Sequence, residues 1–72
     1  MARFSGRGLL QPFSCEKLIS ESVLVNNLGV FLGLPESYIR NLIVVRGSKK
    51  LDANDIITND DEIILFLATM GG

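Results

Sequence analysis

The chain has 72 residues, of which 47% are hydrophobic and 21% charged, a composition typical of one small globular domain rather than of a disordered segment. A single cysteine, Cys15, and the absence of histidine exclude an internal disulfide, a Cys/His zinc site, a four-cysteine iron–sulfur cluster and a histidine-based catalytic triad. Seven basic and eight acidic residues give a net charge of −1, which disfavours nucleic acid as a partner held by bulk charge.

The sequence shows no targeting signal. No apolar stretch follows Met1 in the way that a secretory signal requires, and the longest apolar run, residues 63–68, is too short to cross a bilayer. We therefore expect a cytoplasmic protein with no membrane partner. In that compartment Cys15 is interpreted as a small buried hydrophobe, since Lys17 alone gives weak support to a reactive thiolate.

The first twenty residues favour a hairpin of two strands. Residues 1–10 are interrupted by Gly6 and Gly8 and predict an irregular strand at a sheet edge. Gln11 and Pro12 indicate a turn. The alternation of apolar and polar side chains over residues 13–19 predicts a second strand beside the first.

One helix is expected next. Ser20 or Ser22 would cap its first turn, and Glu21 would suit the positive end of the helix dipole. Gly33 and Pro35 would end it. The apolar side chains expected on its core-facing side recur at helical spacing and are Leu24, Val25, Leu28, Phe31 and Leu32.

The second half of the chain predicts further strands. The β-branched run 42–45 indicates a buried strand, followed by a turn and a short return strand at residues 49–51. Ile56 and Ile57 are the expected anchors of the polar segment 52–59, and residues 62–68 form the last strand. This order predicts one α+β domain over residues 1–72, with a mixed sheet packed on one helix.

The last strand is apolar on both faces, whereas a strand with one solvated face alternates. Ile63, Leu65 and Leu67 share one side, which we assign to the core. Ile64 and Phe66 then lie on the open face of the sheet as an apolar docking patch for a partner. The alternative is that a loop or a second copy of the chain covers this face.

Acidic residues concentrate before and at the start of this strand. They are Asp52, Asp55, Asp60, Asp61 and Glu62. Such a charge run is either an ordinary solvated surface or a means of steering the chain towards a basic partner.

The sequence closes with Thr69, Met70, Gly71 and Gly72, which we expect to form a flexible tail directly after the last strand. Glycine lacks a Cβ, so a Gly-Gly backbone enters channels that are too narrow for any side chain. A terminal glycine carboxylate is an unhindered nucleophile towards the α-phosphate of ATP, and the resulting acyl-adenylate is open to attack by sulfur. Since this chemistry needs no catalytic side chain on the carrier, we expect no enzymatic activity of the chain itself.

These features resemble the ThiS/MoaD family of small sulfur carriers, which have a ubiquitin-like β-grasp fold. Residues 42–47 are similar to the family's central strand and the turn after it, and residues 59–63 to the start of its last strand. Residues 64–72 are similar to that strand and its Gly-Gly end. Residues 66–70 look more like the thiamine-type carriers, because the Pro-Pro of many MoaD members is absent before the tail.

The resemblance implies a function and its partners. A ThiF/MoeB-like adenylating enzyme would use ATP and magnesium to load AMP onto Gly72, so the chain itself would bind no cofactor. A sulfurtransferase or cysteine desulfurase would then supply the sulfur of a terminal thiocarboxylate. A sulfur-accepting synthase would take that sulfur, and the thiazole of thiamine is favoured over molybdopterin as the product.

Two other functions stay open. A ubiquitin-like protein modifier would use the same activation, but Gly72 would end on a lysine amine instead of receiving sulfur. A non-carrier β-grasp module that binds protein or RNA would not need Gly71 or Gly72.

Overall fold

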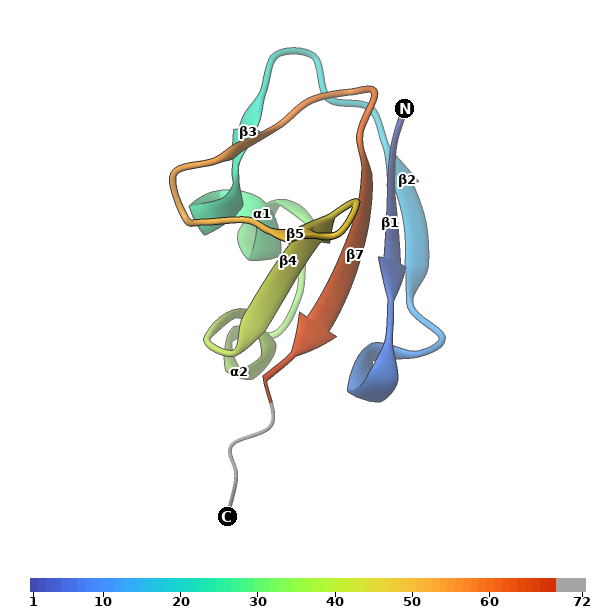
Figure 1. Ribbon diagram of the computed structural model, residues 1–72, viewed down its shortest axis with the longest axis vertical. Helices are drawn as coiled ribbons and strands as arrows, with labels where there is room; N and C mark the ends of the chain where they lie inside the picture. Colours follow the sequence, from blue (N-terminus) through green and yellow to red (C-terminus); the bar gives the residue numbers. More distant parts are fainter. Residues whose placement is uncertain (69–72) are drawn as a thin grey trace.

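The computed structural model describes residues 1–68 of the chain, in which two short helices lie on one side of the main β-sheet (Figure 1). In chain order the elements are β1 (Ala2–Gly6), the 3₁₀ helix η1 (Gly8–Leu10), β2 (Ser14–Lys17), β3 (Val23–Leu24), α1 (Val25–Phe31), α2 (Glu36–Ile39), β4 (Leu42–Arg46), β5 (Lys49–Lys50), β6 (Ile56–Ile57) and β7 (Glu62–Leu67).

Five of the strands form one mixed sheet in the spatial order β2-β1-β7-β4-β5, and β3 pairs with β6 in a separate ladder. β1 and β7 are parallel neighbours in the middle of the sheet, whereas β1 with β2, β7 with β4 and β4 with β5 are antiparallel (Figure 1). The predicted α+β architecture, a mixed sheet with a helix on one face, is confirmed.

The prediction of an edge strand in residues 1–10 is wrong, because β1 lies between β2 and β7. Phe4 is fully buried in this interior strand, which has β2 on one side and β7 on the other. Gly6 does not break the strand. A Cβ at Gly6 would collide with the carbonyl oxygen of Leu10, so glycine at this position lets η1 fold back closely on the strand.

The predicted hairpin is confirmed. β2 pairs antiparallel with β1, and Phe4 lies opposite Cys15. β2 is shorter than the predicted strand over residues 13–19, and Gln11 and Pro12 form the turn after η1. The hairpin thus supplies the edge strand β2, while its first strand becomes interior.

The start of the helix differs from the prediction. α1 begins at Val25 without a side-chain cap, so the predicted capping by Ser20 or Ser22 is wrong. The two residues before α1 instead form β3, which pairs with β6. The backbone N–H of Val25 donates to the carbonyl oxygen of Asp55 at 2.9 Å, so a distant segment satisfies a donor that a capping side chain otherwise takes.

The core-facing side of α1 is narrower than predicted. Leu28 is fully buried, and Val25 and Leu32 pack against the core as expected. Leu24 and Phe31 are exposed, so their assignment to the core is wrong. Leu24 belongs to β3 rather than to the helix, and Phe31 lies at the margin of the buried side.

Gly33 follows the end of α1, as predicted. Its φ of 73° is a left-handed conformation that glycine adopts without strain. Pro35 then stands at the start of α2, a four-residue helix that the sequence analysis did not anticipate.

The second half of the sheet agrees with the predicted strands over residues 42–45, 49–51 and 62–68, with shifts of about one residue at their ends. Ile57 is fully buried, as predicted, whereas Ile56 is exposed and its prediction as an anchor is wrong. The two residues are adjacent in β6, and adjacent strand residues point to opposite sides.

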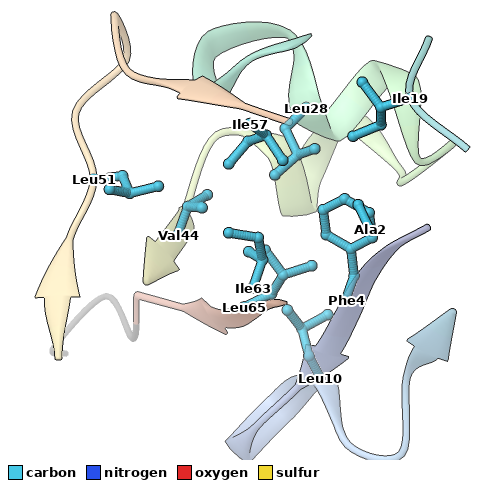
Figure 2. Packing of buried hydrophobic residues seen from close by; sticks show 10 residues of the cluster. All are labelled: Ala2, Phe4, Leu10, Ile19, Leu28, Val44, Leu51, Ile57, Ile63 and Leu65. Carbon is cyan, nitrogen blue, oxygen red and sulfur yellow. The ribbon is translucent and has the colours of Figure 1, made fainter. Parts of the chain in front are cut away.

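The core lies between the sheet and α1. Figure 2 shows side chains of β1, β4 and β7 meeting Leu28 from α1 and Ile57 from β6. The buried hydrophobic residues are Ala2, Phe4, Leu10, Ile19, Leu28, Val44, Leu51, Ile57, Ile63 and Leu65. Within residues 1–68, no helix has the length and apolar character needed to cross a membrane.

Candidate functional site

β7 carries apolar side chains on both of its faces. Ile63 and Leu65 are buried in the core, and Leu67 packs against it. Ile64 is half-buried and Phe66 is 38% exposed, because alternate residues of a strand point to opposite sides of the sheet. The two residues predicted to dock a partner therefore lie on the face away from α1, and their role in binding stays a prediction.

β4 extends this apolar surface. Val45 lies directly opposite Ile64 in the ladder, and Ile43 lies opposite Phe66. Directly opposed residues of neighbouring strands share a face. These four residues define the open-face patch: Ile43, Val45, Ile64 and Phe66.

Sequence reasoning missed the two β4 members of the patch. The run 42–45 predicts a buried strand, but Val44 alone of these four residues is buried. The signal was present in the sequence, since a strand that is apolar at every position has side chains on both faces, and α1 covers one of them.

Cations flank the open-face patch on both sides. On the β1 side, Ser5 lies opposite Ile64, and Arg7 follows two residues later in extended conformation, in line with Phe66. On the other side, Lys50 of β5 lies opposite Val45. Arg7 and Lys50 form no ion pair with any residue that the structure describes.

The end of the sheet nearest the start of β7 is charged. Arg3 lies between Glu16 of β2 and Glu62 of β7, with its Nε 3.4 Å from Glu16 Oε2 and its Nη1 4.0 Å from Glu62 Oε1. All three side chains are more than half exposed, so these pairs are screened and contribute little stability. The open face thus changes from an ion-paired row to an apolar patch along β7.

The tail residues Thr69, Met70, Gly71 and Gly72 lie outside the described residues. The last described contact of the strand is made by Ala68, whose backbone N–H donates to the carbonyl oxygen of Asn41 at 2.7 Å. This bond continues the antiparallel ladder with β4 beyond the Leu42–Leu67 pair. The backbone is therefore held in the sheet until the residue before the tail.

Three of the five clustered acids are engaged within the chain. The Asp61 carboxylate lies 3.1 Å from the Arg46 guanidinium, and the Asp55 carboxylate accepts the backbone N–H of Asp52 at 2.7 Å. Glu62 pairs with Arg3. The Asp55 and Asp61 contacts organise the turns before β6 and β7, whereas the Glu62 pair joins β7 to β1.

Cys15 packs against the core from β2 and is half-buried. Burial raises the pKa of its thiol above the ordinary value of 9.0, and the nearby charge of Lys17 opposes that rise. A thiol with a raised pKa holds little thiolate at neutral pH, so this side chain is a poor nucleophile there.

Over residues 1–68, no group of three or more Cys, Asp or Glu side chains is arranged to hold a metal ion. The chain matches no protein-family model and no curated protein.

Proposed function

We propose that this chain is a small sulfur carrier of the ThiS/MoaD type. The observation that carries the proposal is the continuity between the apolar face of β7 and the Gly-Gly sequence. Phe66 lies exposed on that face, and Gly71 and Gly72 follow within six residues. A partner that holds the open-face patch would therefore have the glycines within reach of its own active site.

The proposal includes a ubiquitin-like β-grasp fold for the domain. Its support is the mixed sheet with the parallel pair β1 and β7 at its centre and α1 across one face. Because β7 is bonded to β1 and β4 along its length, the last strand is a rigid base for the residues that follow.

The proposal requires Gly72 to be the C-terminal residue of the mature protein, so that its carboxylate is the reacting group. A carboxylate oxygen bonds to the α-phosphorus of ATP, and pyrophosphate leaves. A sulfur nucleophile then bonds to the acyl carbon, and AMP leaves. With hydrosulfide as that nucleophile, loss of its proton leaves a terminal thiocarboxylate. ATP and magnesium belong to the activating enzyme, and the chain contributes only the carboxylate and the surface that docks.

The partners follow from this chemistry. A ThiF/MoeB-like adenylating enzyme would bind the open-face patch, a sulfurtransferase or cysteine desulfurase would supply sulfur, and a synthase that makes the thiazole of thiamine would accept it. Arg7 and Lys50 flank the patch, so the surface of the adenylating enzyme would place carboxylates on either side of an apolar centre. This distribution favours an acidic rim on the partner over the basic one that the clustered acids alone would suggest.

The test is the intact mass of the full chain after incubation with ATP, magnesium, sulfide and ThiF/MoeB-type enzymes. We expect one oxygen to be replaced by one sulfur, at Gly72. Fragmentation of the C-terminus and a thiocarboxylate-specific alkylating label separate this change from oxidation of Met1 or Met70. The matched control lacks Gly72 and should gain no sulfur.

Two outcomes would replace the proposal. If neither the full chain nor the variant without Gly72 gains sulfur with any of several enzymes, the glycines have no carrier role. The hypothesis of a non-carrier binding module is then favoured. If Gly72 instead forms an amide with lysines of other proteins, the chain is a ubiquitin-like modifier.

A further inference from the structure

A second apolar surface lies on the outer side of α1, away from the core. Val30 is 74% exposed, and Leu24, Phe31 and Ile56 are also exposed beside it. These four residues, from β3, α1 and β6, define the helix patch. Together with Ser22, Val23 and Asn27 they line a groove of about 570 Å³.

The helix patch carries no charge. None of its lining residues is acidic or basic. The sequence from residue 22 to residue 35, which includes all of α1, contains no Asp, Glu, Lys or Arg. A surface helix ordinarily places charged side chains on its solvent side. α1 therefore presents no charged side chain to solvent, and its exposed residues are Asn26, Asn27, Val30 and Phe31. Its Gly29 is buried against Ile39 of α2, so the helix patch is the apolar part of α1 that the fold leaves open.

The helix patch and the open-face patch belong to opposite sides of the domain. α1 packs Leu28 onto one face of the sheet, whereas Phe66 lies on the other face. A partner on the helix patch would therefore leave the open face free, and this surface is not explained by the carrier function.

We propose that the helix patch is the interface of a homodimer, in which α1 of one copy packs against α1 of a second copy about a twofold axis. In such an interface each surface meets itself, so any charge on it faces its own image. An uncharged apolar surface can therefore pair with itself without bringing like charges together. A strongly charged partner would gain neither steering nor ion pairs from it.

The open-face patch cannot pair with itself without bringing like charges together. Arg7 flanks it on one side and Lys50 on the other. Whichever flanks meet when two copies stack face to face, a cation faces a cation, and like charges brought together at an interface are unfavourable. Charge thus assigns the two apolar surfaces to different occupants: a second copy for the helix patch, and a different protein for the open face.

The helix patch is small for a protein–protein interface. A standard interface buries ~800 Å² on each partner, about a sixth of the 4841 Å² accessible surface of this chain. The seven residues of the groove are fewer than the ~20 residues a side of such an interface. We therefore expect a weak dimer whose population depends on protein concentration.

The test is sedimentation velocity of the full chain from low micromolar to submillimolar concentration. Wild type should move from monomer to dimer, whereas Val30→Glu should stay monomeric, because it places two carboxylates face to face. Leu18→Glu is the matched control, since Leu18 is 67% exposed but lies outside the patch. Phe66→Glu tests whether the open face takes part in the dimer. Both controls should dimerise as wild type does.

A second readout does not depend on how the variants fold. On dilution of the wild type, backbone amide NMR shifts should change in residues 22–31 and at Ile56, and stay constant in β4 and β7. A monomer at every concentration overturns the proposal. So does a dimer that Phe66→Glu breaks and Val30→Glu does not.

Discussion

The carboxylate of Asp61, in the turn before β7, contacts the guanidinium of Arg46 in β4. Its Oδ2 lies 3.1 Å from the guanidinium of Arg46 at the end of β4, and it also accepts the backbone N–H of Thr58 at 2.8 Å. Arg46 in turn donates to the carbonyl oxygen of Ile56 at 3.0 Å. These bonds tie β6, the turn that follows it and β4 together at the point where β7 begins.

Asp61→Ala should therefore destabilise the fold. We expect a loss of ~2 kcal/mol in the free energy of unfolding, since the side chain is only 17% exposed and its bonds are charge-assisted. Asp61→Asn keeps an acceptor for Thr58 and should lose about half as much. Urea denaturation followed by circular dichroism measures both. The exposed neighbour Asp60, changed to Ala, is the control, and an equal loss there would contradict this role of Asp61.

Two glycines should respond differently to substitution. Gly6→Ala should cost ~1–3 kcal/mol, because the new Cβ would collide with the carbonyl oxygen of Leu10. Gly33→Ala should cost ~1–2 kcal/mol for another reason: its surroundings are open, but its φ is 73°.

Asparagine separates the two causes. It adopts the left-handed conformation more readily than alanine, so Gly33→Asn should be more stable than Gly33→Ala. At Gly6 the order should be reversed: Gly6→Asn should be less stable than Gly6→Ala, because its larger side chain collides more severely. Thermal unfolding of the four variants gives the ranking, and the same order at both positions would refute the assignment of causes.

Substitutions on the two faces of β7 should lower the free energy of unfolding by different amounts. Leu65→Ala should cost ~2–5 kcal/mol, because Leu65 is fully buried. Phe66→Ala should cost ~1 kcal/mol, mainly through its cross-strand contact with Ile43. Chemical denaturation of the two variants is a direct comparison. Equal losses would show that the open face is covered in the isolated protein.

The sheet was more predictable from the sequence than the helix. Residues 42–45 and 62–68 are apolar runs that carry their own strand signal, and the structure keeps both within about one residue. The start of α1 was not predictable from local residues. Its first donor bonds to Asp55, thirty residues later, and no short-range rule identifies such a partner.

The position of β1 was missed for a similar reason. Gly6 and Gly8 suggested a weak edge strand, because glycine supplies no side chain to pack. The parallel pairing with β7 joins the two ends of the described chain and has no local signature. For the candidate site, alternation along β7 identified Ile64 and Phe66, whereas Ile43 and Val45 required the register of β4 against β7.

Cys15 should be slow to react at neutral pH. Burial raises the pKa of its thiol, and the charge of Lys17 lowers it in part. Reaction with a disulfide reagent at pH 8 should be slower for the folded chain than for the chain in urea. Lys17→Gln should slow it further, while Lys50→Gln, the matched loss of charge elsewhere, should not.

The same raised pKa gives a pH dependence of stability. The fold favours the neutral thiol, so its contribution is complete below the ordinary value of 9.0 and is lost as the pH rises through the folded pKa. Cys15→Ala should remove this loss of stability above pH 9.0. It should not change how the free energy of unfolding depends on pH near pH 7. A thiol that reacts equally fast in the folded and unfolded chain would contradict the effect of burial.

The charge that flanks the open-face patch should control loading by an adenylating enzyme. Arg7→Glu should raise KM for the carrier about tenfold with little change in kcat, because Arg7 would contact the rim of the partner and not the reacting carboxylate. Lys17→Glu makes a comparable change of charge at a residue opposite the buried Ala2, on the side away from the patch, and should leave KM unchanged. The tenfold difference should shrink as salt is added.

Phe66→Ser completes this comparison, since it removes apolar area from the centre of the patch. Its effect on KM should persist at high salt, where that of Arg7→Glu is lost, because apolar burial is not screened. If Arg7→Glu and Lys17→Glu load equally well while Gly72 still gains sulfur, the carrier function stands and the acidic rim of the partner does not. If Phe66→Ser also loads normally, the enzyme recognises the tail alone, and the open-face patch serves another partner.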